Sequence, residues 1–391
     1  MNRADRWVLP EGVEDLLPEQ AEQVEVLRRR LVDLFQSWGY RLVIPPLAEY
    51  LESLLTGTAE DLDLQTLKVV DQKSGRLMGI RADMTPQVAR IDAHRMQVEG
   101  PNRLCYIGPV LLARGRGLDP HRSPIQVGAE LFGHAGRESD LEVLDLLLAA
   151  LAAVEVGEVA LDLGHVGLFR ALAERAGLAP EVEARLFDAL QRKARSELEQ
   201  LGSAHLPPEA AAWFVALADL VGGPEVIDQA RECLAGAGAR AERALDELAA
   251  VSAGLLARHP GLRLSLDLGE LRGYHYHTGL VFTAYRAADG QTLALGGRYD
   301  HVGEVFGRAR PATGFSMDLR VLADHSAVGA PAASLVEAPW DDDPDLHRLV
   351  AELRRQGRTV LWRLPGTPER PGAGRIVRHA GRWQLQENED Q

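Results

Sequence analysis

Two stretches decide the fold: Tyr106-Ile107-Gly108-Pro109-Val110-Leu111-Leu112-Ala113-Arg114 and Gln126-Val127-Gly128-Ala129-Glu130-Leu131-Phe132-Gly133. They predict two neighbouring strands, near 103–111 and 124–133, because each is rich in apolar residues and a loop rich in glycine and proline separates them. Positions four apart lie on the same face of a strand, so the side chains of Gln126 and Glu130 are expected to point the same way.

The pattern outward from these strands predicts an α+β fold with a mainly antiparallel sheet flanked by helices. Before them we expect a helix at 18–38, a strand at 40–44, a helix at 47–56, strands at 68–71 and 76–80, and a helix at 85–96. After them we expect a mostly helical insertion at 138–257 with a strand at 158–163, then strands at 262–268, 280–285, 293–296 and 312–317.

We predict a core over residues 1–325, which includes that insertion, and a small C-terminal α/β segment over residues 334–391. Loop composition at 326–333 marks the linker between them. The expected elements of the C-terminal segment are a helix at 343–356, a strand at 359–364 and a strand near 376–385.

The net charge of −14 disfavours a protein whose main task is to bind nucleic acid, which needs a basic face. An acidic chain can still carry such a face locally. Only three of the 43 basic residues are lysines, so arginine is a compositional habit and a lone arginine at a motif position is weak evidence.

Cytoplasmic residence is the expectation from the remaining composition. Cys105 and Cys233 lie far apart without CxxC spacing, which predicts buried small apolar side chains and no disulfide framework or zinc site. The longest apolar run, residues 141–156, is interrupted by Glu142, Asp145 and Glu155, so no membrane span is expected. No apolar signal core follows the N-terminal residues.

Several motifs, taken in order, resemble those of class II aminoacyl-tRNA synthetases, and most closely the histidyl enzyme. The resemblance runs from the N-terminal region to about residue 322. The opening stretch resembles motif 2, and the helix, strand and proline at 20–46 resemble motif 1, which in that family builds the dimer interface. Three further segments resemble R-P-E-G-T, R-G-L-D-Y-Y-T-G and G-G-R-Y-D: Arg81-Ala82-Asp83-Met84-Thr85-Pro86, Arg272-Gly273-Tyr274-His275-Tyr276-His277-Thr278-Gly279 and Gly296-Gly297-Arg298-Tyr299-Asp300.

This resemblance implies a pocket for free histidine. The α-ammonium group needs hydrogen-bond acceptors, which Asp83, the Thr85 hydroxyl and the Gln126 carbonyl oxygen can supply. Glu130 is the matched acceptor for a ring N–H of the ligand. For Asp83 alone, a carboxylate at a helix N-terminus before Thr85-Pro86 is an equally good interpretation.

The third motif adds Arg272, Tyr276 and His277 to the histidine pocket that the resemblance implies. Arg272 matches a histidyl-specific arginine, although an arginine paired with a carboxylate at the edge of the core explains it equally well. Tyr276 and His277 stand where the family has two tyrosines, so the tyrosine that would contact the imidazole is replaced. His275 and His277 alternate as metal ligands on a strand would, but no third ligand is evident and no metal is expected.

The ATP side of the resemblance is altered. Adenylation places charge on the α-phosphate, which class II enzymes stabilise with arginines from motifs 2 and 3. The motif 2 arginine position is Leu112, and Arg114 on the same expected strand face is displaced by roughly 6–7 Å. In motif 3 the glutamate–arginine pair is Arg320-Val321, and a glycine is Asp318, which would repel phosphate. We therefore expect neither catalysis nor a cofactor.

The C-terminal segment is too short for the anticodon-binding domain that histidyl-tRNA synthetases carry. From residue 354 onward eight arginines make the tail basic, but the compositional bias favours a solvated or partner-facing surface over a nucleic-acid site. They are Arg354, Arg355, Arg358, Arg363, Arg370, Arg375, Arg378 and Arg382.

With these losses, the chain is most similar to the synthetase paralogues that regulate ATP phosphoribosyltransferase in the first step of histidine biosynthesis. That resemblance implies a dimer within a hetero-oligomer, a short-form catalytic subunit as partner, histidine as the effector of feedback, and no tRNA. One alternative is an active histidyl-tRNA synthetase with a truncated tail. Another is a binding-only module that contacts RNA or a different enzyme.

Overall fold

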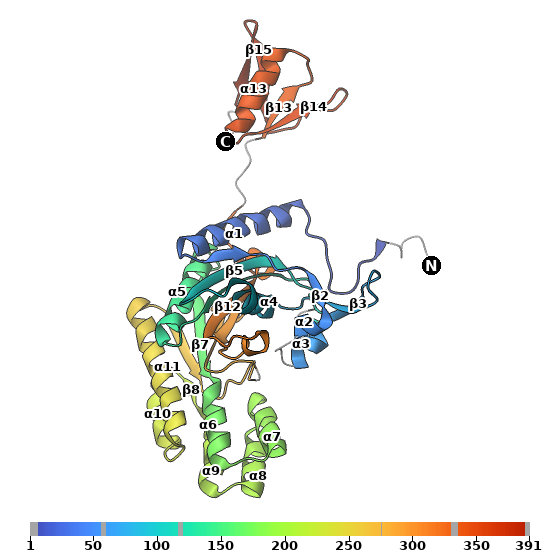
Figure 1. Ribbon diagram of the computed structural model, residues 1–391. Helices are drawn as coiled ribbons and strands as arrows, with labels where there is room; N and C mark the ends of the chain where they lie inside the picture. The colour runs from blue at the N-terminus through green and yellow to red at the C-terminus, as the bar shows by residue number, and fades with distance from the viewer. Residues whose placement is uncertain (1–6, 56–59, 116–119, 275, 330–334, 388–391) are drawn as a thin grey trace. The chain divides into compact units, whose positions relative to one another are not determined.

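The protein is described here by a computed structural model that covers residues 7–55, 60–115, 120–274, 276–329 and 335–387 (Figure 1). The chain divides into two compact units, residues 1–328 and residues 329–391. The larger unit is an α+β fold built on a nine-stranded sheet, which confirms the predicted fold class.

The nine-stranded sheet is mainly antiparallel and has the order β1-β5-β6-β12-β11-β10-β7-β9-β8. Only the pairs β1–β5 and β7–β9 are parallel. The stretches quoted at the outset form the antiparallel pair β5–β6 beside the centre of the sheet, as the sequence predicts. The strands are β1 (Arg41–Val43), β5 (Asn102–Pro109), β6 (Ile125–Phe132), β7 (Val159–His165), β8 (Val221–Gly222), β9 (Arg263–Asp267), β10 (Leu280–Arg286), β11 (Thr292–Arg298) and β12 (Ala312–Asp318).

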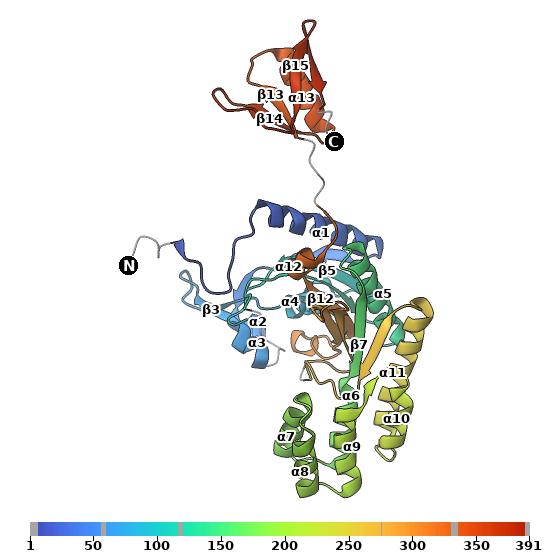
Figure 2. The same ribbon diagram turned by 180° about the vertical axis from the view of Figure 1, so that it is seen from behind.

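Three helices, α1 (Pro18–Ser37), α5 (Arg137–Ala153) and α12 (Leu319–His325), pack against this sheet and one another (Figure 2). The α1 helix is amphipathic as predicted, and the side chains on its apolar face are buried because they meet α5, α12 and the sheet. Phe35 of α1 makes an edge-to-face contact with Phe315 of β12, at 6.0 Å between ring centroids. The helical layer thereby holds the strands that carry the site.

The stretch from 138 to 257 is mostly helical, as expected, but its first helix and its strand belong to the core, because α5 covers the sheet and β7 lies within it. The helices after β7 pack on one another and form a lobe beside the sheet (Figure 1). They are α6 (Val166–Ala176), α7 (Pro180–Gln191), α8 (Arg195–His205), α9 (Pro208–Asp219), α10 (Val226–Cys233) and α11 (Ala239–Arg258).

A second sheet has three strands in the order β2-β4-β3 and precedes the helix α4 (Thr85–Arg90) in the sequence. The predicted helix at 47–56 is wrong in its first half, because residues 48–50 form a strand that pairs with β4 and so satisfies its backbone groups in a sheet. The elements are β2 (Ala48–Tyr50), α2 (Leu51–Leu55), α3 (Glu60–Gln65), β3 (Leu67–Val70), β4 (Leu77–Ile80), α4 (Thr85–Arg90) and the π-helix η2 (Ile91–Met96).

The C-terminal unit is a four-stranded sheet of order β14-β13-β15-β16 with one helix against it. The strand expected near 376–385 is a hairpin instead, because residues 380 and 381 have positive φ and reverse the chain. A strand that the sequence analysis missed begins directly after the expected linker and lies in the middle of the sheet. The elements are β13 (Leu335–Pro339), α13 (Pro344–Arg355), β14 (Thr359–Arg363), β15 (Gly374–His379) and β16 (Arg382–Gln386).

Among the described residues, no helix has both the length and the apolar character needed to cross a membrane.

Candidate functional site

Glu130 lies on β6 at the centre of a buried polar cluster, and its side chain is only 1% exposed. Three hydroxyl groups donate hydrogen bonds to its carboxylate. The Thr85 hydroxyl reaches Oε1 at 3.0 Å and the Tyr106 hydroxyl reaches the same oxygen at 3.1 Å. The Tyr299 hydroxyl donates to Oε2. This arrangement holds one carboxylate in a single orientation inside an environment that excludes water.

Gln126 lies four residues before Glu130 on the same strand, and the two side chains face the same segment, as the spacing predicts. The Gln126 side chain accepts a hydrogen bond from the Met84 backbone N–H at 2.8 Å and donates one to Asp83 Oδ1 at 2.7 Å. Asp83 also accepts from the Thr85 backbone N–H at 3.0 Å. Asp83 therefore lies in the same cluster as Gln126 and also accepts a backbone N–H at the start of α4.

The four residues predicted for the amino-acid side thus meet at one place. Their hydrogen bonds join β6 to the start of α4, which lies more than 40 residues away in the chain. All three predicted acceptors already form hydrogen bonds within the protein, and Asp83 has the largest remaining acceptor capacity for an ammonium group because a carboxylate has two oxygens.

Two glycines make room for the cluster. Gly314 on β12 pairs directly with Glu130, and a Cβ there would lie 1.6 Å from Glu130 Oε2. Gly128 pairs with Tyr106, and a Cβ there would lie 2.4 Å from the tyrosine hydroxyl. Side chains at these two positions would displace the groups that surround the carboxylate, so the glycines are required by close approach.

Burial raises the pKa of Glu130 to about 8, although the hydrogen bonds from Tyr299, Thr85 and Tyr106 act in the opposite direction. Removal from water disfavours the charged form of a carboxyl group, and that effect dominates here. The Glu130 carboxyl group is therefore largely protonated at neutral pH. A positively charged ligand group brought to it would favour the ionised form.

This shift predicts a pH dependence of stability. The folded protein keeps the Glu130 proton up to about pH 8, whereas the unfolded chain loses it near the ordinary glutamate pKa of 4.5. The free energy of unfolding should therefore fall as pH rises from about 5 to 8, relative to a Glu130→Gln variant that cannot titrate, by at most about 1.4 kcal/mol per pH unit. Urea denaturation of both proteins across this range measures the difference; parallel pH profiles would contradict the shift.

Tyr276 and His277 lie beside this cluster. The Tyr276 ring is 5.0 Å from the Tyr299 ring and 5.4 Å from the His277 ring, centroid to centroid. The Tyr276 hydroxyl is buried and has no hydrogen-bond partner in the part of the chain that the structure describes. A ligand with a ring nitrogen would supply that partner. His277 Nδ1 donates to the Arg298 carbonyl oxygen at 3.3 Å, and burial lowers the pKa of its ring to about 4, so the ring is neutral. His275 lies outside the described residues.

Arg272 lies apart from the cluster. Its side chain is about half exposed, donates to the Thr283 hydroxyl at 3.1 Å and is 3.7 Å from the Glu270 carboxylate. Arg272 and Gln126 nevertheless line one cavity of about 560 Å³, which extends over Leu112, Met317 and other apolar side chains. Of the predicted residues, Arg272 and Gln126 thus line the open cavity, and the others surround or adjoin Glu130.

Two positions that the resemblance places on the ATP side, Leu112 and Asp318, line that cavity, and neither carries positive charge. Leu112 is buried in its wall. Arg114 is exposed and does not line this cavity, and the predicted shared strand face with Leu112 is wrong because β5 ends at Pro109. Leu112 and Arg114 therefore lie in the loop that follows β5.

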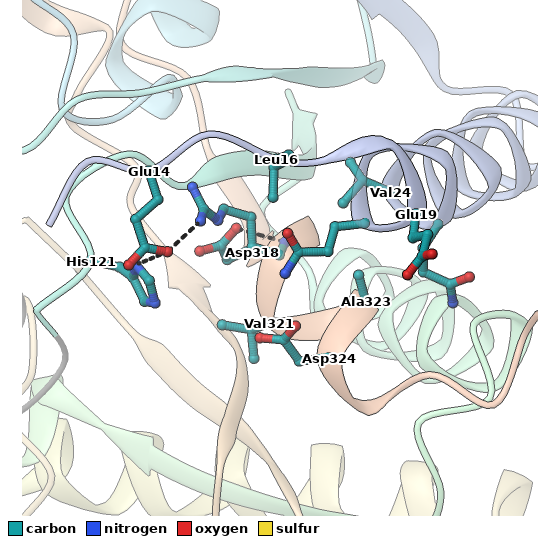
Figure 3. Close-up of a pocket in the computed structure, with 12 residues that line it drawn as sticks. Glu14, Leu16, Glu19, Val24, His121, Asp318, Val321, Ala323 and Asp324 are labelled. Carbon is teal, nitrogen blue, oxygen red and sulfur yellow. Dashed lines mark hydrogen bonds and ion pairs between the residues drawn. The ribbon is translucent and has the colours of Figure 1, made fainter. Parts of the chain in front are cut away.

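Asp318 caps α12 by accepting the Arg320 backbone N–H at 3.0 Å, so a carboxylate already occupies the positive end of that helix. Arg320 turns to Glu14, at 3.4 Å, and to the Ser123 hydroxyl, at 3.3 Å. Glu14, Asp318 and Arg320 line a second cavity of about 320 Å³ that shares His121, Asp318 and Val321 with the first (Figure 3). Arg320 is thus engaged by a carboxylate.

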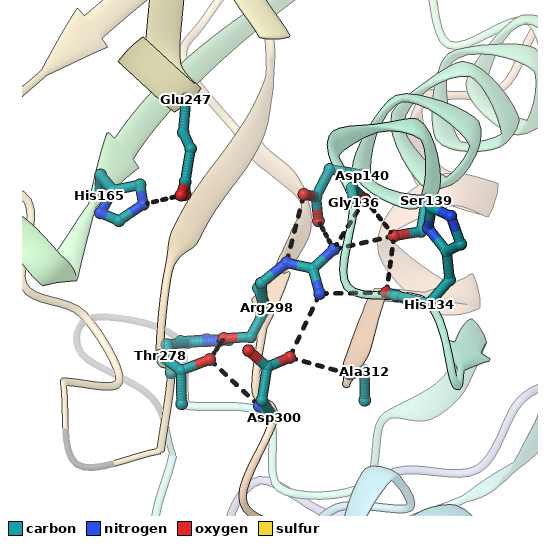
Figure 4. Close-up of polar contacts among 11 residues, drawn as sticks. His134, Gly136, Ser139, Asp140, His165, Glu247, Thr278, Arg298, Asp300 and Ala312 are labelled. Atoms are coloured by element: carbon teal, nitrogen blue, oxygen red, sulfur yellow. Dashed lines mark hydrogen bonds and ion pairs between the residues drawn. The ribbon is translucent and has the colours of Figure 1, made fainter. Parts of the chain in front are cut away.

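Arg298 of the G-G-R-Y-D motif is a buried structural link (Figure 4). Its guanidinium forms an ion pair with Asp140 of α5 at 2.9 Å and donates to the Ser139 hydroxyl at 2.8 Å. Its carbonyl oxygen accepts the Thr278 backbone N–H at 2.7 Å and the His277 ring N–H. Arg298 therefore joins the helical layer to the segment that carries Tyr276 and His277.

The sequence analysis missed Tyr106 and Tyr299 as members of the cluster. Tyr299 belongs to the G-G-R-Y-D segment, so the sequence does point to its position. The sequence signal for Tyr106 is weaker: it is Gly128, which pairs with Tyr106 on the neighbouring strand. Neither position alone shows that the hydroxyl groups converge on Glu130, because the two residues are 193 apart in sequence.

Comparison with known proteins identifies the family to which the chain belongs. Residues 12–322 match the histidyl-tRNA synthetase family model, and residues 333–386 match the C-terminal domain of the ATP phosphoribosyltransferase subunit HisZ. Proteins named ATP phosphoribosyltransferase regulatory subunit from Pseudomonas syringae pv. tomato and Azotobacter vinelandii are 53% and 54% identical, each over 98% of this chain and 99% of the relative.

Solved structures agree. A crystal structure titled an ATP phosphoribosyltransferase regulatory subunit/histidyl-tRNA synthetase from Bacillus halodurans has a TM-score of 0.83 and 27% identity, over 94% of this chain and 96% of that one. A subunit of the ATP phosphoribosyl transferase (HisG:HisZ) complex from Thermotoga maritima shares the fold, with a TM-score of 0.58 and 21% identity, over 78% of this chain and 98% of that one. With relatives above 50% identity along nearly its whole length, the chain belongs to the family of ATP phosphoribosyltransferase regulatory subunits.

Proposed function

We propose that this protein is the non-catalytic regulatory subunit of an ATP phosphoribosyltransferase, and that histidine bound beside Glu130 regulates the catalytic subunit. The observation that carries the proposal is a buried cluster of the four predicted amino-acid-side residues beside a cavity whose expected ATP positions are apolar or acidic. Asp83, Thr85, Gln126 and Glu130 meet at the pocket, while Leu112 and Asp318 line the adjoining cavity.

Histidine suits the pocket by the chemistry of its two ends. Its ring N–H finds an acceptor in Glu130, and its other ring nitrogen finds a donor in the buried hydroxyl of Tyr276. Its ammonium group finds the Asp83 carboxylate, and its carboxylate finds Arg272 at the cavity mouth.

The ATP side supports a role without adenylation. A triphosphate placed over Leu112 would meet an apolar wall and the Asp318 carboxylate, and Arg320 is engaged by Glu14. Transition-state stabilisation of phosphoryl chemistry depends on positive charge aimed at the phosphate oxygens. Without positive charge aimed at the phosphate, bound histidine is not adenylated in this proposal.

Self-association through the N-terminal region is part of the proposal. Twelve of the sixteen large apolar side chains found exposed among the described residues lie between residues 7 and 77. The β1 strand, which is the edge of the nine-stranded sheet, is in this region, and Ile44 directly after it is 79% exposed. Exposed apolar side chains concentrated in this way are typical of a surface that another protein covers.

A role in tRNA binding is not supported by the C-terminal unit. Seven of its nine arginines form ion pairs with carboxylates of the same unit, so little positive charge is left to neutralise phosphates.

Regulation follows from linkage. Histidine changes the activity of the catalytic subunit only if it binds two states of the assembly with unequal affinity. In this proposal histidine contacts the start of α4 directly, because Asp83 and Thr85 lie there. Hydrogen bonds join both residues to side chains of β6.

The test uses the purified full chain with a short-form catalytic subunit. We expect histidine to bind in isothermal titration calorimetry, the chain to stimulate the transferase, and histidine to reduce that stimulation. We expect no histidine-dependent exchange between ATP and pyrophosphate. A chain that neither binds nor stimulates the transferase would overturn the proposal.

The second candidate is an active histidyl-tRNA synthetase. The match to the synthetase family model over residues 12–322 and the presence of Arg272 at the cavity favour it. Robust exchange by the pure protein would establish this alternative in place of the first.

A further inference from the structure

The C-terminal unit exposes a pair of large apolar side chains at one edge of its sheet. The β13 and β14 strands are parallel neighbours, and their last residues, Pro339 and Arg363, pair with each other (Figure 1). The next residue of each strand, Trp340 and Leu364, therefore emerges at the same carboxyl end of the sheet. Trp340 is 58% exposed and Leu364 is 54% exposed.

Two more rings extend this surface. Trp362 lies edge-to-face with Trp340, at 6.0 Å between centroids, and His347 of α13 lies tilted against Trp362 at 5.0 Å. The His347 ring Nε2–H donates to the Asp341 carbonyl oxygen at 3.0 Å, which fixes the loop after Trp340. We call Trp340, His347, Trp362 and Leu364, with Asp341 and Asp342, the carboxyl-end patch.

The rim of the carboxyl-end patch is acidic. Asp341 and Asp342 are exposed. Asp341 Oδ1 accepts the Asp343 backbone N–H at 2.9 Å, and Asp343 accepts the Asp345 backbone N–H and the Trp383 indole N–H, each at 2.9 Å. An exposed tryptophan beside exposed carboxylates matches a cation held against apolar surface, because the indole ring and the carboxylates both attract positive charge.

The charge of the chain limits what can cover the patch. Residues 329–391 contain nine arginines and ten carboxylate side chains, so nearly all of the net charge of −14 lies in residues 1–328. The core of the same chain and the core of a second copy are therefore both acidic and would repel Asp341 and Asp342. Nucleic acid is disfavoured for the same reason. The remaining component of the proposed assembly is the catalytic subunit.

We propose that the carboxyl-end patch docks a basic segment of the catalytic transferase, one in which arginine or lysine is flanked by apolar side chains. This inference rests on the proposed function. Attachment of the unit to the core keeps the patch at high local concentration beside a transferase that the core has already bound, so a modest contact contributes to the assembly.

The test compares the full-length chain with a Trp340→Ser/Leu364→Ser variant and an Asp341→Asn/Asp342→Asn variant in binding to the catalytic subunit. Both exposed pairs lie outside the core of the unit. We expect the first variant to bind roughly tenfold more weakly, the loss typical of truncated apolar anchors. We expect the second to associate more slowly and to show less dependence on salt. Val305→Ser, which removes a side chain that is 51% exposed on the larger unit, is the matched control.

The outcomes separate the two proposals. If the unaltered chain does not bind the transferase, the proposed function fails. If it binds and both variants bind equally well with the same salt dependence, the docking surface is wrong while the proposed function stands. A change in self-association of the Trp340→Ser/Leu364→Ser variant, measured by analytical ultracentrifugation without transferase, would assign the patch to a second copy and overturn this inference.

Discussion

Replacement of Glu130 by alanine is expected to weaken histidine binding by about 100-fold or more, which corresponds to roughly 3 kcal/mol, because a buried N–H of the ligand would be left without its acceptor. Glu130 is the carboxylate on which Thr85, Tyr106 and Tyr299 converge. Without it, the ligand ring N–H loses its acceptor and the three hydroxyl groups lose theirs. Calorimetric titration with histidine, together with the histidine response of the transferase, measures the change.

The matched control for this prediction is Glu142→Ala. Glu142 on α5 also binds several groups, since its carboxylate accepts from Arg103 at 2.6 Å and from the Tyr40 hydroxyl at 3.1 Å, but it lies outside the pocket. Its loss should reduce stability and leave histidine affinity unchanged. Both variants should still assemble with the transferase. Unchanged feedback in the Glu130→Ala protein would remove this pocket as the site of regulation.

Replacement of Arg298 by methionine is expected to lower the free energy of unfolding by about 3–5 kcal/mol, because it leaves the Asp140 carboxylate buried without its ion pair. The guanidinium and Asp140 are both buried, and they are joined by contacts of 2.9 Å and 3.2 Å. Urea denaturation at neutral pH measures the loss.

Two comparisons make the Arg298 prediction specific. The Arg286→Met variant removes a pair with Asp289 whose side chains remain partly in solvent, and its effect should be below about 1 kcal/mol. A double Arg298→Met/Asp140→Leu variant should recover much of the stability, because it removes both buried charges together. If the single and double variants were equally unstable, the ion pair would not be the cause.

Most of the fold could be predicted from the sequence, because local residue patterns specify most of its helices and strands. The amphipathic spacing of α1, the turn between β3 and β4 and the glycine-rich β5–β6 pair were all predicted close to where the structure has them. The failures share one cause. Residues 48–50 pair with β4 and residues 374–386 form a hairpin, and both outcomes depend on hydrogen-bonded partners elsewhere in the chain that local apolar spacing does not encode.

The candidate site divides in the same way. The sequence by itself determined that Gln126 and Glu130 share a strand face, and that Leu112 and Val321 stand where the resemblance expects arginines, because strand periodicity and residue identity are local properties. The tertiary structure alone decided that Tyr106 and Tyr299 surround Glu130, that Arg320 turns to Glu14, and that burial raises the Glu130 pKa. These contacts join residues up to 306 apart in the chain, and the desolvation of a carboxyl group depends on every segment that excludes water from it.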